Sequence, residues 1–146
     1  FGGGEFVLGN HRLMEERGQC SAELETILRR HEMQGRTISL LATTDGVVAL
    51  FAVADSLKPS SREAISSLRV MGITSVMLSG DNQTTADAVA REAGIERVRG
   101  DLLPNDKLEA IRALQREFGL IAMAGDGIND APALAKAHVS ISPISA

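Results

Sequence analysis

The fold is decided by ten residues near the C-terminus, Gly125-Asp126-Gly127-Ile128-Asn129-Asp130-Ala131-Pro132-Ala133-Leu134. The short uncharged run 120–124 before them predicts a buried strand that ends at Gly125. Open α/β proteins bind ligands at the edge formed by the carboxyl ends of such strands. Two carboxylates and an amide at that edge suit a hard cation, so we expect magnesium at Asp126 and Asp130. The alternative is a glycine-rich turn followed by an Asp cap on a helix.

The rest of the C-terminal half alternates between strands and helices. Expected strands cover residues 74–78, 97–99, 120–124 and 139–141. Expected helices cover residues 60–71, 83–93, 104–118 (with Phe118 on its buried side) and 130 to about 137. This alternation predicts an α/β fold with a parallel, doubly wound sheet.

The N-terminal third has a different pattern, typical of α+β structure. We expect a strand over 5–8, a helix over 11–17 capped by Asn10, a helix from Ser21 to about 34 with Glu25 in solvent, and strands over 37–42 and 47–53. The Asp-Gly pair at 45–46 predicts a hairpin between the last two strands. The chain therefore divides into residues 1–54 and 55–146, with a junction near 55–59.

Two further polar groups follow expected strands in the C-terminal part. Ser79-Gly80-Asp81-Asn82 comes directly after the strand 74–78, where a hydroxyl and exposed backbone N–H groups suit a phosphoryl oxygen. Lys107 lies in the first turn of the helix that begins at Pro104, where an anion would offset the helix dipole. The alternatives are a Ser/Asn helix cap and a solvated surface charge. Hydroxyl, lysine and paired carboxylates together are typical of phosphoryl transfer.

Composition excludes several other classes of protein. The net charge is −4 and no Lys/Arg cluster is present, which argues against nucleic-acid binding. Cys20 is the only cysteine, so the chain forms no internal disulfide, and a reducing cytoplasmic setting is the simplest interpretation. The spacing of His11, Cys20 and His31 matches no compact zinc pattern, and we interpret Cys20 and His31 as ordinary helix-end and helix-face residues.

The motifs resemble a known family. Ser79-Gly80-Asp81-Asn82, the Pro-x-x-Lys pair at 104–107 and residues 125–134 look like the phosphorylation domain of P-type cation-transporting ATPases, in the haloacid dehalogenase-like superfamily. Residues 10–21 are similar to the nucleotide-binding domain of the heavy-metal group, particularly its zinc/cadmium/lead exporters. The resemblance implies a haloacid dehalogenase-like (Rossmann-like) sheet in 55–146, behind a partial α+β nucleotide-binding domain in 1–54.

The resemblance also assigns roles to individual residues. It implies catalytic roles for Ser79, Gly80, Asp81, Lys107 and Asn129, nucleotide contacts or a hinge role for Asp55, Asp81 and Asn82, and magnesium binding by Asp126 and Asp130. In this scheme Ser79 contacts the phosphoryl group and Lys107 stabilises developing negative charge. The implied cofactors are ATP and Mg²⁺.

Several parts of the family pattern are absent from this sequence. It has no Asp-Lys-Thr-Gly-Thr segment to supply the phosphorylated aspartate, no His-Pro element and no membrane helices. We therefore expect a soluble, cytoplasmic piece of a membrane-embedded transporter, in which ATP hydrolysis through an aspartyl-phosphate drives heavy-metal export. Its partners are then ATP, magnesium and the remainder of the transporter chain, with the transported cation reached only through the membrane domain. The isolated chain is expected to be inactive.

Two other functions stay open at this point. A haloacid dehalogenase-type phosphatase shares the lysine and the carboxylate pair, but it needs an Asp-x-Asp nucleophile loop that the sequence lacks. A non-catalytic regulatory or nucleotide-binding remnant of a truncated transporter is the third hypothesis. Without a central strand, the strands ending at Leu78 and Ala124 must close a gap, pair directly or recruit another strand, and we expect association through exposed strand edges.

Overall fold

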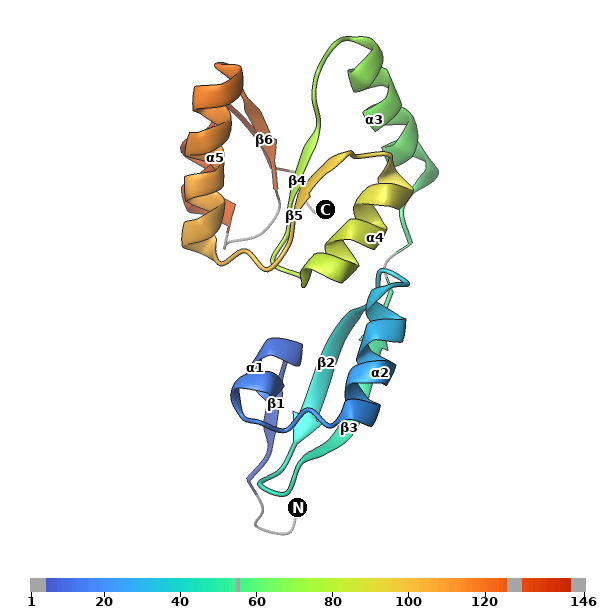
Figure 1. Cartoon of the computed structure of the whole chain (residues 1–146). Helices are drawn as coiled ribbons and strands as arrows, with labels where there is room; N and C mark the ends of the chain where they lie inside the picture. The colour runs from blue at the N-terminus through green and yellow to red at the C-terminus, as the bar shows by residue number, and fades with distance from the viewer. Residues whose placement is uncertain (1–4, 55, 126–129, 143–146) are drawn as a thin grey trace.

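The computed structural model describes residues 5–54, 56–125 and 130–142. Figure 1 shows an N-terminal part, residues 5–54, and a C-terminal part that contains the remaining described residues. The cartoon places the helices α1 and α2 with strands β1 to β3 in the first part, and every later element in the second.

The N-terminal part is a three-stranded antiparallel sheet with two helices packed on its middle strand. Its elements are β1 (Val7–Gly9), α1 (His11–Glu16), α2 (Ala22–Glu32), β2 (Thr37–Ala42) and β3 (Val47–Val53), with strand order β1-β2-β3. The side chains of Asn10 and Ser21 accept hydrogen bonds from the backbone N–H groups of Leu13 and Leu24, so both predicted helix caps are confirmed. The predicted hairpin is also present, with Gly46 at a positive φ of 142°.

The core of this part lies between β2 and the two helices. Alternate side chains of β2 are buried because successive residues of a strand point to opposite faces. The buried cluster consists of Met14, Leu28, Ile38, Leu40 and Ala42. Met14, Leu28 and Leu40 are fully buried, which confirms the packing role expected for Met14.

The C-terminal part alternates strands and helices, as predicted. Its elements are α3 (Pro59–Val70), β4 (Val76–Leu78), α4 (Gln83–Ala93), β5 (Arg97–Arg99), α5 (Pro104–Phe118), β6 (Ala122–Ala124), α6 (Ala131–Leu134) and β7 (Val139–Ile141). Helix α6 ends at Leu134, earlier than the predicted end near Ala137.

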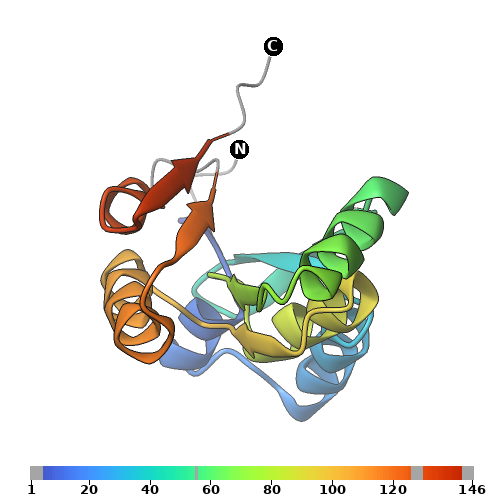
Figure 2. The same ribbon diagram turned by 90° about the horizontal axis from the view of Figure 1, so that it is seen from above.

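The parallel strands form two separate pairs. β4 pairs with β5 and β6 pairs with β7, each in parallel, which confirms the α/β class. Within the described ranges no ladder joins β4 to β6, so the predicted single sheet is split. Figure 2 shows the two pairs as separate ribbons. Within the described residues, the strands on either side of this gap do not close it.

The C-terminal part buries small side chains and leaves large ones exposed. Its buried apolar residues are Ala86, Ala90, Ala93, Ala110, Ile111 and Ala133. Val70 is 86% exposed and Leu120 is 82% exposed. Phe118 is 42% exposed, with the Arg97 guanidinium 5.0 Å from its ring centre, so its predicted burial is wrong. Since burying one large apolar side chain contributes about 1.5–3 kcal/mol, this part has less hydrophobic stabilisation than its sequence offers.

Candidate functional site

The loop after β4 holds Ser79 and Asp81 in one compact turn. The Ser79 Oγ donates a hydrogen bond to Asp81 Oδ2 at 3.0 Å and accepts one from the Asp81 backbone N–H at 3.1 Å. The Leu102 N–H donates to the Ser79 carbonyl at 3.1 Å, and the Asp101 N–H donates to the Asp81 carbonyl at 2.6 Å. The loops after the two parallel strands β4 and β5 are therefore bonded to each other.

Asp101 is a structural residue of this site that the sequence reasoning missed. Its carboxylate accepts a hydrogen bond from the Gln83 N–H at 3.0 Å, and the Gly100 N–H donates to Gln83 Oε1 at 2.7 Å. Asp101 also has a positive φ of 57°, the only such non-glycine residue in the described part of the chain. The signal was available, because the pair Gly100-Asp101 after an expected strand repeats the pattern of Gly80-Asp81.

Asp81 and Asn82 face the N-terminal part. The Thr37 hydroxyl donates to Asp81 Oδ1 at 3.2 Å, and Asn82 Nδ2 donates to Glu32 Oε1 at 2.5 Å. Asn82 Oδ1 accepts from the Thr85 N–H at 2.8 Å, so Asn82 is the cap of α4 and both ends of its amide are engaged. The Thr85 hydroxyl donates to the Arg36 carbonyl at 3.3 Å. The cap interpretation of this loop is therefore correct for Asn82.

Lys107 and Asp130 form an ion pair. Lys107 Nζ lies 2.7 Å from Asp130 Oδ1, and the two side chains are only 14% and 16% exposed. Asp130 makes no side-chain cap to α6, so the simple helix-cap alternative is wrong for this residue. Within the described residues, Asp130 is the anion beside Lys107.

The candidate residues fall into two sets that are not bonded to each other. Within residues 5–54, 56–125 and 130–142, no hydrogen bond or ion pair joins the Ser79 loop to the pair formed by Lys107 and Asp130. Three predicted site residues, Asp55, Asp126 and Asn129, lie outside the described residues.

The Asp130 carboxylate offers an oxygen ligand of the kind that magnesium prefers. Lys107 contacts Oδ1, while Oδ2 lies beside Gly125, where a Cβ atom would come within 3.1 Å of it. Gly125 therefore leaves room beside this carboxylate oxygen that a larger residue would fill. Magnesium prefers such oxygen ligands, together with water and phosphate oxygens.

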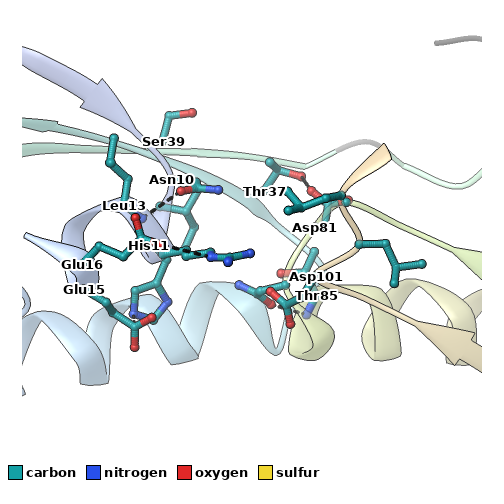
Figure 3. A pocket seen from close by; sticks show the side chains of 16 residues that line it. Asn10, His11, Leu13, Glu15, Glu16, Thr37, Ser39, Asp81, Thr85 and Asp101 are labelled. Atoms are coloured by element: carbon teal, nitrogen blue, oxygen red, sulfur yellow. Dashed lines mark hydrogen bonds and ion pairs between the residues drawn. The ribbon is translucent and has the colours of Figure 1, made fainter. Parts of the chain in front are cut away.

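A cavity of about 700 Å³ lies between the two parts. Figure 3 shows its lining, which comes from Asn10 and α1, β2, the loops 80–82 and 101–103, and Thr85 of α4. Its carboxylates are Glu15, Glu16, Asp81 and Asp101, whereas Arg12 and His11 are its basic residues. Arg12 is already bonded to Glu16, at 3.2 Å. Four carboxylates repel a bare polyphosphate. This lining therefore favours a cation, or an anion that already has a cation bound to it.

His11 extends from this cavity into a bridge between two carboxylates. Its Nδ1 lies 2.9 Å from Glu32 Oε1, and its Nε2 lies 3.0 Å from Glu25 Oε1. Burial alone lowers the pKa of His11, but the hydrogen bonds and charges of Glu25 and Glu32 outweigh it and raise that pKa above its ordinary value. Glu25 keeps part of the solvent exposure expected for it, with 41% of its side chain exposed, and it also contacts His11.

Comparison with known proteins identifies the class. Residues 3–138 match the family of haloacid dehalogenase-like hydrolases, so the chain belongs to this family. It is 40% identical over 144 residues to a copper-exporting P-type ATPase of Bacillus subtilis (strain 168), covering 96% of this chain and 18% of that protein. It is 42% identical over 134 residues to a copper-exporting P-type ATPase of Staphylococcus haemolyticus (strain JCSC1435), covering 92% of this chain and 17% of that protein.

Solved structures agree with these relatives. A zinc-transporting PIB-type ATPase in its E2·Pi state matches with a TM-score of 0.63 and 34% identity, over 97% of this chain and 22% of that one. The catalytic domain of the CPx-ATPase CopB-B matches with a TM-score of 0.64 and 30% identity, over 71% and 41%. The resemblance to heavy-metal P-type ATPases is thereby confirmed.

The chain spans about a fifth of the length of these P-type ATPase relatives, 18% and 17%. None of the helices in the described ranges has the length and apolar character needed to cross a bilayer.

Proposed function

We propose that this chain is part of the cytoplasmic ATP-hydrolysing unit of a heavy-metal P-type ATPase. Residues 1–54 are then the C-terminal part of the nucleotide-binding domain, and 55–146 are the phosphorylation domain without its nucleophile strand. The observation that carries the proposal is the partly buried ion pair between Lys107 and Asp130, at 2.7 Å. In a chain of this family, this ion pair holds the Lys107 ammonium beside the Asp130 carboxylate, at the edge of a parallel strand pair.

The Lys107 ammonium is the most strongly positioned group of the proposed site. Since Asp130 holds it in place, it can offset negative charge that develops on a transferring phosphoryl group without first reorienting. Asp126 and Asp130 would hold magnesium, which, when bound, neutralises phosphate charge and orients the reacting group. Asn129 would assist at the phosphate.

Ser79 binds a phosphoryl oxygen only after a local change. Its hydroxyl proton is directed at Asp81 Oδ2, 3.0 Å away, so the hydroxyl must rotate to donate to phosphate. Asp81 then loses that donor but keeps the one from Thr37. Gly80 leaves the backbone of this turn accessible. Asp81 thus sets the direction of the Ser79 hydroxyl, which is the role we propose for it.

The cavity between the two parts is the proposed site for the nucleotide. Its four carboxylates oppose the entry of a free polyphosphate, because its two basic residues, Arg12 and His11, are already bonded to glutamates. ATP is therefore proposed to bind as its magnesium complex, near Asp81 and Asn82, with Asp55 at the connection between the parts. We propose that Asn82 contacts the nucleotide through its side-chain NH₂ group, which in this structure donates to Glu32.

The remainder of the transporter chain is proposed to supply the reacting aspartate. The split between the pairs β4–β5 and β6–β7 is where a strand bearing that aspartate would fit. The cargo is a heavy-metal cation that passes through the membrane domain of the whole transporter. The relatives named above are copper-exporting and zinc-transporting, so we propose a cargo cation of this kind.

Phosphorylation assays test this proposal. Given magnesium and ATP labelled in its γ-phosphate, the full transporter that contains these residues should form an acid-stable phosphoenzyme, and the isolated chain should form none. In the transporter, Lys107→Met should slow phosphoenzyme formation about 10²-fold, because one fixed stabilising group of a transition state is worth that much. Lys136→Met is the matched control, since Lys136 is exposed.

Two results would contradict the proposal. Sustained magnesium-dependent ATP hydrolysis by the isolated chain would mean that the reacting group is already present. A Lys107→Met transporter with the rate of the unaltered protein would remove Lys107 from the site. Hydrolysis of a small phosphate ester by the isolated chain would instead favour the phosphatase hypothesis.

A further inference from the structure

A second group of metal-ligating side chains lies in the N-terminal part of the chain. A ring nitrogen of His11, Cys20 Sγ and a Glu25 carboxylate oxygen all lie within 4.8 Å of one another, and Nε2 is the nitrogen that faces Glu25. His11 opens α1, Cys20 lies in the link between the two helices, and Glu25 is in the first turn of α2. The spacing in the sequence did not indicate a site, because the three ligands come from three different segments that the fold brings together.

We propose that His11, Cys20 and Glu25 form a binding site for a divalent cation of the zinc class. Zinc binds sulfur at about 2.3 Å and nitrogen or oxygen at about 2.0–2.2 Å in tetrahedral geometry, so neighbouring ligand atoms lie roughly 3.3–3.7 Å apart. The Nε2 and Oε1 atoms are already 3.0 Å apart. Small side-chain rotations therefore suffice to bring all three ligand atoms onto one cation.

Glu32 orients the histidine for this purpose. Its Oε1 lies 2.9 Å from Nδ1 of His11, on the side of the ring opposite the other two ligands, and its side chain is only 6% exposed. Histidines that bind metals usually donate their second ring N–H to a carboxylate, which fixes the tautomer and directs the free nitrogen at the metal. The amide of Asn82 in turn holds the same Glu32 oxygen.

The charges and protons of the site balance. A bound dication would displace the proton on Nε2 and the thiol proton of Cys20, and both would leave to solvent. The thiolate and the Glu25 carboxylate then neutralise its two positive charges. The fourth position is open to water or to Glu15, whose Oε1 lies 3.9 Å from Nε2 and whose side chain is 58% exposed.

The mixture of donors selects the cation. One nitrogen, one sulfur and one carboxylate oxygen suit zinc, or cadmium, which has similar ligand preferences. Magnesium takes oxygen ligands, and a soft monovalent copper ion prefers several sulfur ligands to a single one beside a carboxylate. The site is independent of the pair formed by Lys107 and Asp130, so either proposal can fail without the other.

Cobalt is the probe that tests the site, because its spectrum reports its ligands. The purified chain should bind one equivalent of Co²⁺ at this site, with a sulfur-to-cobalt charge-transfer band and intense tetrahedral bands, and Zn²⁺ should displace it. Cys20→Ser should abolish the charge-transfer band, and His11→Gln should weaken Zn²⁺ binding at least about tenfold. His31→Gln is the matched control, because His31 bonds Arg36 outside the cluster.

Three controls keep the result interpretable. Cobalt held by Asp126 and Asp130 would have oxygen ligands and give no sulfur band. Circular dichroism of each variant shows whether it is folded, and Zn²⁺ should raise the melting temperature of the unaltered chain but not of Cys20→Ser. Glu32→Gln should lower Zn²⁺ affinity about tenfold or more. If the sulfur band is missing, or Zn²⁺ binds the folded Cys20→Ser chain equally well, the cluster is only a hydrogen-bonded bridge and the proposal is wrong.

Discussion

Replacing Gly100 by alanine tests how tightly the two loops of the candidate site are packed. Gly100 follows β5 and lies against the first turn of α4. A Cβ atom there would come within 2.6 Å of Gln83 Cα and 2.7 Å of Gln83 N. These are backbone atoms, which cannot rotate away as a flexible side chain can, so the loop and the helix must separate.

Separating the loop from the helix lowers the free energy of unfolding. Overpacking of a well-packed region typically costs about 1–3 kcal/mol. The movement also strains the hydrogen bond from the Gly100 N–H to Gln83 Oε1, which is worth about 1 kcal/mol. We therefore expect Gly100→Ala to lower the free energy of unfolding by about 2–4 kcal/mol, and the melting temperature by roughly 5–15 °C.

Gly80→Ala is the matched control. Its Cβ would meet only the Leu102 carbonyl oxygen, at 3.4 Å, and neither Gly80 nor Gly100 has a left-handed φ. The change should therefore stay within about 0.5 kcal/mol. Thermal unfolding followed by circular dichroism measures both variants, and hydrogen exchange should show faster exchange in residues 81–86 and 97–103 of Gly100→Ala alone. Equal melting temperatures for the two variants would refute the reasoning.

Three further predictions concern other parts of the chain. Met14→Ala should lower the free energy of unfolding by about 2–5 kcal/mol because Met14 is fully buried. Met33 is 64% exposed, so Met33→Ala should lower it by under about 0.5 kcal/mol. Urea unfolding compares the two variants, and similar losses of stability would contradict the assigned core. Burial, with the hydrogen bond and charge of Glu25, raises the pKa of Cys20 to about 11 from 9.0. Alkylation of the metal-free chain at pH 8 should therefore be about 100-fold slower than for an ordinary thiol, and an equal rate would contradict this environment. Because β7 exposes Val139 and Ile141 (each 55%) beside an incomplete sheet, sedimentation should show association that increases with concentration, and a strict monomer would count against it.

Short-range features of the sequence, such as caps and turn residues, predicted most of the helices and strands. The helix α4 begins and ends where predicted because its boundaries depend on near neighbours: Asn82 caps its first turn, and Gly94, at a φ of 79°, ends it. The hairpin of β2 and β3 was predicted for the same reason, from an Asp-Gly pair and two apolar runs. How the parallel sheet closes was left open, and its split into two pairs was not predicted, since strand pairing depends on contacts between distant segments.

The site residues show the same limit. Recognition of motifs selected Lys107 and Asp130, but it did not predict that they would form an ion pair across 23 positions of sequence. Helical periodicity placed Glu25 in solvent, and 41% of its side chain is exposed. It did not predict the contact with His11, 14 positions earlier, because periodicity considers only the helix itself. Asp101 was missed because its role depends on the first turn of α4, which lies beside it only in the folded chain.

A small set of hydrogen bonds joins the two parts of the molecule. Within the described residues, three side-chain hydrogen bonds cross the contact between them: Asn82 to Glu32, Thr37 to Asp81, and Thr85 to the carbonyl of Arg36. At about 1 kcal/mol each, they stabilise the contact by roughly 3 kcal/mol. This free energy corresponds to about one molecule in a hundred in which the contact is open. Two of the acceptors are carboxylates, so a cation or phosphate that changes the charge near Asp81 or Glu32 would shift this population.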